Sequence, residues 1–246
     1  MKTTMHKAAQ YLATAAISFI KKKDDDSHTN LGWYNHKLET HAFPNGDKLA
    51  LNYKDFSLEW IHNKNQEQLS LQGKTHLEIT DWISKISQNK GLENSYDYAL
   101  HYDLPYDDVI NSTTYVITNQ NALNALIEQR DLAQNVLASI LSSNNYESSL
   151  RIWPHHFDTG AFFNLNDNLS IGLGMAIPDS VIDDFYFYVS GYNGHDKIDL
   201  GKINDLKLGS YFNKDWYGFA LPISGINKQT AVDFCNEAIN RYRDTL

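Results

Sequence analysis

The feature that most constrains the fold is the order in which helical and extended patterns alternate along the chain. Apolar residues at helical spacing near the N-terminus predict a packed helix, and period-two segments between residues 31 and 73 predict strands. A helical pattern then follows Thr75 and closes at Gly91. The same order returns later, with a helix over 118–143, strands from 149 to 223 and a last helix near Asn227. We therefore expect an α+β fold: an antiparallel sheet built from two similar helix–strands–helix halves, with the helices packed on one side.

One turn predicts how the first strands pair. Pro44, Asn45, Gly46 and Asp47 separate two segments of alternating apolar residues, 31–43 and 48–63. An Asn-Gly step in this position is a strong hairpin signal, because both residues adopt a positive φ at low cost. Residues 91–118 show no such periodicity, and we expect them to cross between the halves.

The repeated order suggests an internal duplication. We expect residues 1–246 to form a single compact unit with halves at 1–115 and 116–246. The segment HKLETHAF (36–43) aligns with HHFDTGAF (155–162), so that His, Thr, Ala and Phe coincide. The order of elements suggests the duplication, and this short alignment supports it only mildly.

Charge and composition narrow the class of protein. A net charge of −9 argues against a nucleic-acid partner, because phosphate binding depends on clustered Lys and Arg. The single cysteine, Cys235, excludes an intramolecular disulfide, fits a reducing cytoplasmic location, and is expected in the core of the last helix. The N-terminal apolar stretch contains Gln10, Thr14 and Ser18, so it is interpreted as a packed helix and not as a signal peptide. No other stretch approaches a membrane span, and no membrane association is expected; the oligomeric state is left open.

The densest group of reactive side chains lies in RIWPHHFDTGAFF, residues 151–163. In a strand, alternate side chains point to opposite faces, which would place Trp153 and His155 on the core side and His156 and Asp158 on the other. His155 is then most simply a core histidine with satisfied ring nitrogens. A carboxylate beside an imidazole is the arrangement that general bases and metal ligands use, and a solvent-facing polar strand is the alternative for His156 and Asp158.

Two classes of function follow from this stretch. The first is a small-molecule-binding domain with a pocket near residues 151–158, because many rings surround a few polar groups. The polar contacts would come from His156, Asp158 and Arg151. A purely structural or partner-binding protein is a third reading, which an exposed patch of rings would favour. The residues predicted to line the pocket are Arg151, Trp153, His155, Tyr192 and Trp216.

The second class is a hydrolase, metal-dependent in one version, in which His156 acts as base or metal ligand and Asp158 orients it. Two ligands on one strand are too few for a metal, so no metal and no cofactor is assigned. Gly172 and Gly174 lack the third glycine of a dinucleotide fingerprint, and no Walker loop or nucleophile elbow is present. A complete metal site would need further ligands, for which the candidates are His36, Glu39, His41, His101 and His195.

Four stretches carry a resemblance to a known family: WPHHFD (153–158), GLGMAIPD (172–179), FYFYV (185–189) and DWYGFALP (215–222). In this order they resemble the Trp-Pro-x-His-Phe-Asp motif, the following turn and two strands of an uncharacterised bacterial family, domain of unknown function 5996. The chain departs from that pattern at Met175–Ile177, where the family usually has Ser-Pro-Gly. The resemblance covers most of the chain and implies that His155, His156 and Asp158 matter. It implies no activity, because none is established for the family.

Overall fold

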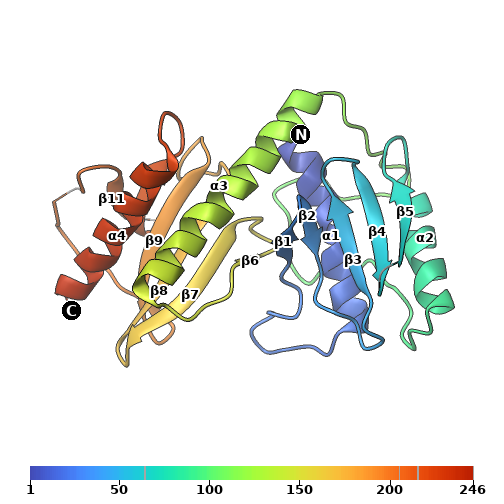
Figure 1. The fold of residues 1–246 in the computed structure, drawn as a ribbon, viewed down its shortest axis with the longest axis horizontal. Helices are drawn as coiled ribbons and strands as arrows, with labels where there is room; N and C mark the ends of the chain where they lie inside the picture. Colours follow the sequence, from blue (N-terminus) through green and yellow to red (C-terminus); the bar gives the residue numbers. More distant parts are fainter. Residues whose placement is uncertain (64, 205, 215, 246) are drawn as a thin grey trace. The chain divides into compact units, whose positions relative to one another are not determined.

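The computed structural model describes residues 1–63, 65–204, 206–214 and 216–245 (Figure 1). Within these ranges the chain forms four helices and two antiparallel sheets, which confirms the α+β class. Asp215, the first residue of one family-like stretch, and Leu246 lie outside the described residues. The chain divides into two compact units instead of the single unit expected. Unit 1 comprises Met1–Gln129 and Ile152–His155, and unit 2 comprises Arg130–Arg151 and His156–Leu246.

Unit 1 contains a five-stranded sheet in the order β1-β2-β3-β4-β5, in which strands that follow one another in sequence pair antiparallel. The predicted Asn-Gly turn joins β2 to β3: the Gly46 amide donates to the Phe43 carbonyl at 2.8 Å, and Gly46 has a φ of 86°. α2 begins at a capping box formed by Thr75 and Glu78. The elements are α1 (Lys2–Phe19), β1 (Gly32–Tyr34), β2 (Lys37–Glu39), β3 (Lys48–Asn52), β4 (Ser57–His62), β5 (Asn65–Ser70) and α2 (His76–Asn89).

α1 is buried on two sides. Its apolar side packs against the sheet, where Phe19 and Trp60 place their ring centroids 6.3 Å apart. Its polar side is covered by the irregular segment 91–118, whose tyrosines supply hydrogen-bond partners: the Tyr102 hydroxyl donates to Gln10 at 2.7 Å. The segment expected to cross between halves lies within unit 1, where it provides the partners that buried polar groups on a helix require.

Unit 2 contains most of a seven-stranded sheet in the order β11-β12-β9-β8-β7-β6, with β10 paired to β9. Asn227 caps α4, since its Oδ1 accepts from the Thr230 amide at 3.0 Å, as the sequence predicts. The boundary between the units falls within α3 and again within β6, not at residue 115. The elements are α3 (Gln120–Asn144), β6 (Arg151–Ile152), β7 (Thr159–Asn166), β8 (Leu169–Ala176), β9 (Tyr186–Asn193), β10 (Asp196–Lys197), β11 (Ser210–Asn213), β12 (Tyr217–Pro222) and α4 (Lys228–Thr245).

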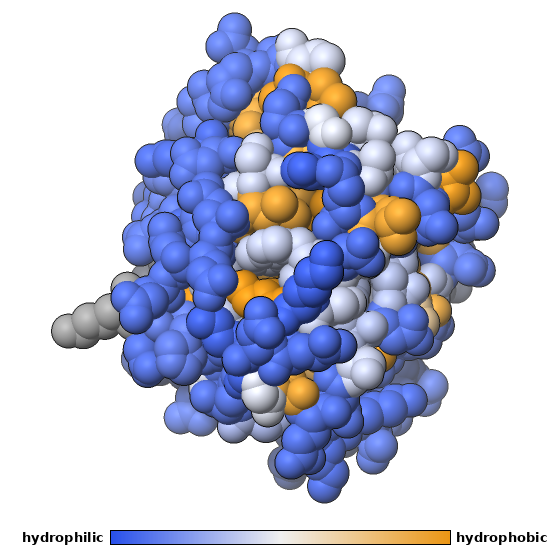
Figure 2. All heavy atoms as spheres, turned by 90° about the vertical axis from the view of Figure 1, so that its right-hand side faces the viewer, coloured by the Kyte–Doolittle hydropathy of each residue, from blue (hydrophilic) through white to orange (hydrophobic). Residues whose placement is uncertain are grey.

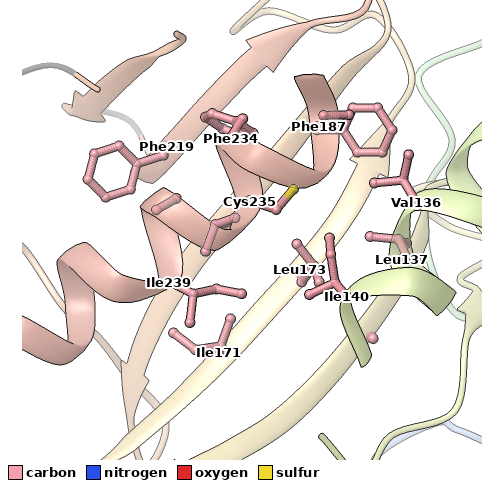
Figure 3. Packing of buried hydrophobic residues seen from close by; sticks show 14 of the residues in the cluster. Val136, Leu137, Ile140, Ile171, Leu173, Phe187, Phe219, Phe234, Cys235 and Ile239 are labelled. Carbon is pink, nitrogen blue, oxygen red and sulfur yellow. The ribbon is translucent and has the colours of Figure 1, made fainter. Parts of the chain in front are cut away.

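The core of unit 2 forms where α3 and α4 cover one face of this sheet (Figure 3). Cys235 lies inside it and is fully buried, as the sequence predicts. Alternate residues of each strand point into this core, so the intervening residues form the opposite face of the sheet. The side chains labelled in Figure 3 come from both helices and from β8, β9 and β12: Val136, Leu137, Ile140, Ile171, Leu173, Phe187, Phe219, Phe234, Cys235 and Ile239.

The strand predicted through residues 153–158 is wrong. β6 ends at Ile152, residues 154–156 form a turn, and Phe157 has a φ of 58° before β7 begins at Thr159. Pro154 explains the break, because proline has no N–H to donate to a strand ladder. Alternation therefore does not decide where His156 and Asp158 point. The segment aligned with this one, 36–43, contains β2, so the structure does not confirm the duplication.

Figure 2 views the molecule from the side on which α2 and β5 appear in Figure 1. Hydrophilic residues cover most of this face, and the apolar ones form small separate groups. Every side chain of β5 except that of Leu69 is exposed, which fits an edge strand that has polar and charged residues against further pairing. None of the helices in the described ranges is long and apolar enough to cross a membrane.

Candidate functional site

The residues predicted to line a pocket belong to both units. Trp153 and His155 belong to unit 1, where their rings lie 6.0 Å apart and His155 also contacts the Tyr102 ring at 5.4 Å. Arg151, Tyr192 and Trp216 belong to unit 2 and are half-buried. A pocket lined by all five therefore remains a prediction.

On the sheet face of unit 2 opposite the helices, several glycines lie beneath large aromatic rings. A Cβ built on Gly174 would lie 2.5 Å from the Tyr188 ring, so that ring occupies the space directly above the glycine. Trp216 lies over Gly218 in the same way, with a distance of 2.4 Å. A larger residue at either position would displace a ring, because real Cβ contacts are not that short.

Three of the rings on this face form a continuous series in unit 2. Tyr188 contacts Trp216 edge-on with centroids 6.3 Å apart, and Trp216 contacts Phe212 at 6.0 Å. Nearby on the same face, Tyr192 contacts Phe162 at 5.7 Å. Phe162 is 53% exposed, and Tyr188, Tyr192 and Trp216 are half-buried, so part of this aromatic surface is accessible.

Asp158 anchors the series at the start of β7. Its Oδ2 accepts a hydrogen bond from the Tyr188 hydroxyl at 2.5 Å, across 30 residues of sequence. The sheet register explains the contact, because Tyr188 pairs with Gly174, which in turn pairs with Gly160 next to the carboxylate. Asp158 is buried, and its Oδ1 has no hydrogen-bond partner in the part of the chain that the structure describes.

A buried cation lies beside the carboxylate. Arg130 of α3 is 5% exposed and donates to the Phe157 carbonyl at 2.6 Å and to the Thr159 hydroxyl at 2.8 Å. Its guanidinium also lies 4.3 Å from the Phe157 ring centroid. These contacts hold the irregular segment before β7 in place, and so they position Asp158.

Burial controls the proton equilibria of this group. It raises the pKa of Asp158 above the ordinary value, against the lowering effects of the Tyr188 hydroxyl and of nearby His156 and Arg130. Burial likewise raises the pKa of Tyr188, and the adjacent Asp158 adds to that increase. A carboxyl whose pKa burial shifts, with an unpaired oxygen and specific charged neighbours, is a candidate functional group.

His156 is exposed, whereas Asp158 is buried. The two belong to the same unit and interact electrostatically, but the carboxylate oxygen Oδ2 is occupied by Tyr188. Glu39 pairs with Lys48 at 3.1 Å and His41 bonds Asn30 at 2.8 Å, both within unit 1. Among the described residues, no group of three or more His, Cys, Asp or Glu is placed to hold a metal ion.

Two cavities lie elsewhere. One, of about 760 Å³, runs along α4 in unit 2 and is lined mainly by charged and amide side chains. The other, of about 340 Å³, lies in unit 1 between the end of α1, the β2–β3 turn and the segment after α2. Neither is lined by a residue predicted for the pocket.

Sequence reasoning missed Tyr188, Arg130 and the role of the glycines. One signal was available: Arg130 follows Leu126 and Ile127 at helical spacing, so a lone cation falls on an apolar stripe. Gly172 and Gly174 within an apolar strand were a second signal, because glycine in a strand often marks a close approach of another group.

Comparisons with family models, curated proteins and solved structures find no match. The site is therefore interpreted from its own geometry.

Proposed function

We propose that unit 2 binds a small molecule on the face of its sheet that carries Tyr188 and Trp216. The observation that carries this proposal is the set of partly exposed rings that occupy the space above glycines on one sheet face. Ligand sites combine such apolar surface with a few fixed polar groups. The ligand class that fits is a small neutral molecule with a flat ring face and at least one hydroxyl group.

Each side chain has a distinct part in this proposal. The rings of Tyr188 and Trp216 provide the surface on which the ring of the ligand stacks. Asp158 is a positioning residue: it accepts the Tyr188 hydroxyl proton in a hydrogen bond, which leaves the phenolic oxygen as an acceptor for a ligand hydroxyl. Arg130 fixes the segment that carries Asp158. The order of the site thus depends on buried groups, and recognition depends on half-buried ones.

Membership in the family that the sequence resembles is also a proposal, and the site supports it in one respect. The four stretches on which the resemblance rests supply Asp158, Gly174, Tyr188 and Trp216, which lie together on this face. Residues far apart in sequence that meet at one surface are typical of a binding site on a sheet.

The experiment uses the full chain labelled with 5-fluorotryptophan, with the Trp216 signal assigned through Trp216→Phe. We expect phenyl β-glucoside, which has a flat face and hydroxyl groups, to shift this ¹⁹F signal in a saturable way. Gly174→Ala should reduce the affinity at least about tenfold, because the added Cβ meets the Tyr188 ring.

Gly172→Ala is the matched control on the same strand and face. Its Cβ would lie 3.1 Å from the edge of the Tyr192 ring, so a small shift accommodates it, and a smaller loss of affinity is expected. The proposal fails if phenyl β-glucoside, indole and adenosine all leave the Trp216 signal unchanged at millimolar concentration.

The second candidate is the hydrolase that uses His156 and Asp158. One observation favours it: an exposed imidazole lies near a buried carboxyl with which it interacts electrostatically. In this proposal His156 acts as the base and Asp158 stabilises its charged form. His156→Gln should then abolish the hydrolysis of 4-nitrophenyl acetate and leave ring binding at Trp216 intact. Unchanged hydrolysis in that variant excludes this role.

A further inference from the structure

A second buried carboxylate, Asp47, lies in unit 1 and is bonded to a histidine. Asp47 is 1% exposed and follows the Asn-Gly turn that joins β2 to β3. Its Oδ2 accepts from the Trp60 indole at 2.7 Å and from the Asn45 amide at 3.1 Å. Its Oδ1 accepts from Nδ1 of His62 at 2.5 Å.

The sheet register brings the two residues together. β3 and β4 pair antiparallel with Lys48 opposite Ile61, so Asp47 and His62 lie at the next position along the same ladder. The carboxylate is held by a turn and by a fully buried tryptophan, and these contacts fix its position before any ligand binds. Preorganisation of this kind is what a positioning carboxylate requires.

The hydrogen bonds also determine the tautomer of His62. An ionised carboxylate can only accept, so Nδ1 carries the hydrogen. In the neutral imidazole Nε2 then has the lone pair, and the side-chain amide of Asn63 lies 3.1 Å from it as a donor. The imidazole is accessible to solvent, since the side chain of His62 is 42% exposed.

A second histidine–aspartate pair in unit 1, His101 and Asp26, lies at the surface and differs from His62 and Asp47 in the exposure of its carboxylate. His101 bonds Asp26 at 3.1 Å through Nε2, and both side chains are about equally exposed, at 42% and 38%. Water competes for both partners there, and pairs of that kind contribute little. In the His62–Asp47 pair only the imidazole is exposed. The Asp47 carboxylate is buried and accepts hydrogen bonds from two further donors, Trp60 and Asn45.

From this geometry we infer that Asp47 and His62 form a general-base site in unit 1. At Nε2 a hydroxyl group, of water or of a small neutral molecule, takes the place of the exposed Asn63 amide. His62 removes the proton of this hydroxyl group, and Asp47 stabilises the imidazolium that forms. The molecule that supplies this hydroxyl group reaches Nε2 from the solvent side, because the imidazole is partly exposed. This inference is independent of ring binding in unit 2.

The first test is the tautomer in the unmodified protein. We expect ¹⁵N chemical shifts and two-bond couplings above neutral pH to show His62 as the Nδ1–H tautomer. His195, which is exposed in the turn between β9 and β10, is the internal reference and should show the Nε2–H tautomer that free imidazoles favour. An Nε2–H tautomer at His62 overturns the inference, with no variant required to fold.

The second test measures water activation with 4-nitrophenyl acetate. Water attacks the acyl carbon while one of its protons passes to Nε2, and the bond to 4-nitrophenolate then breaks. The acyl product is acetic acid, which keeps the second proton until it ionises in solution, and the imidazolium loses the first proton to solvent. His62→Gln should reduce this rate on the order of 100-fold. Asp47→Asn should reduce it similarly, because the amide favours the other tautomer.

Two controls separate this site from others. His195→Gln removes an exposed imidazole of unit 2 and should leave the rate unchanged. His156→Gln tests the hydrolase candidate of unit 2, so a loss confined to that variant locates the activity there and overturns the inference for His62. A rate that is the same in His62→Gln and the unmodified protein also overturns it.

Discussion

Asp47 and Asp158 are both buried carboxyls with a histidine nearby, but their hydrogen bonding differs. Asp47 accepts from Trp60, Asn45 and His62, so both of its oxygens are occupied. Asp158 accepts from the Tyr188 hydroxyl through Oδ2, and its Oδ1 has no partner among the described residues. The Asp47 carboxylate is therefore held in place by its donors and orients the partly exposed imidazole of His62. The Asp158 carboxyl is held by one ring and carries a pKa that burial raises.

The difference shows what decides the role of a buried carboxyl. A buried carboxylate whose oxygens all accept hydrogen bonds is held in place and can orient a neighbouring side chain. A buried carboxyl with an unbonded oxygen can still take up a proton or bind a ligand. Asp47 and Asp158 thus each bond a partly exposed side chain, His62 in unit 1 and Tyr188 in unit 2.

The largest expected effect comes from removing each carboxylate in turn. Asp47→Ala should lower the free energy of unfolding by about 3 kcal/mol, because the Trp60 indole is left buried without an acceptor. Asp158→Ala should cost about 1 kcal/mol or less, since one bond to a half-buried tyrosine is lost and a buried charge is removed. Urea denaturation of both variants measures the difference. Equal losses would contradict the contrast between the two sites.

A somewhat smaller effect is expected at Arg130, which tests whether the cation supports the segment that carries Asp158. Arg130→Met should lower the free energy of unfolding by about 2 kcal/mol, because the buried Phe157 carbonyl and Thr159 hydroxyl lose their donor. Arg243→Ala, at an exposed position in α4, is the control and should cost less than about 0.5 kcal/mol. If both variants were equally stable in thermal unfolding, Arg130 would not hold this segment.

The smallest effect concerns pH. Burial raises the pKa of Asp158 in the folded state above its ordinary value of 3.8. Between the ordinary pKa and the raised pKa, the folded state therefore binds more protons than the unfolded state. The contribution of Asp158 to the free energy of unfolding therefore falls as pH rises through that window. Asp158→Asn lacks this term, so its stability relative to the parent protein should increase from acid toward neutral pH.

The measurement is a series of urea titrations in a His156→Gln background, which removes the imidazole that interacts electrostatically with Asp158. The tyrosines that also interact with Asp158, Tyr186, Tyr188 and Tyr192, stay neutral over this range because burial raises their pKa values. A relative stability that decreases toward neutral pH would show that Asp158 is favoured in its ionised form, as in a fully satisfied carboxylate.

Local patterns of neighbouring residues predict the secondary structure of this protein. The helix–strands–helix order, the Asn45-Gly46 turn and the cap at Asn227 are all confirmed, because helical spacing, strand alternation and capping are properties of neighbouring residues. The sequence also singled out Asp158, whose place in a binding site remains a proposal. The strand predicted across Pro154 failed, since alternation was applied through a residue that cannot join a strand ladder.

The contacts between side chains that lie far apart in sequence follow from the packing of the folded chain. Tyr188 reaches Asp158 across 30 residues, Arg130 reaches Phe157 across 27, and His62 reaches Asp47 across 15. Strand register and helix packing set these contacts, and no local pattern encodes the hydrogen-bond partner of a distant group. The same holds for Gly174: the sequence does not show that the Tyr188 ring occupies the space that a Cβ at this position would take.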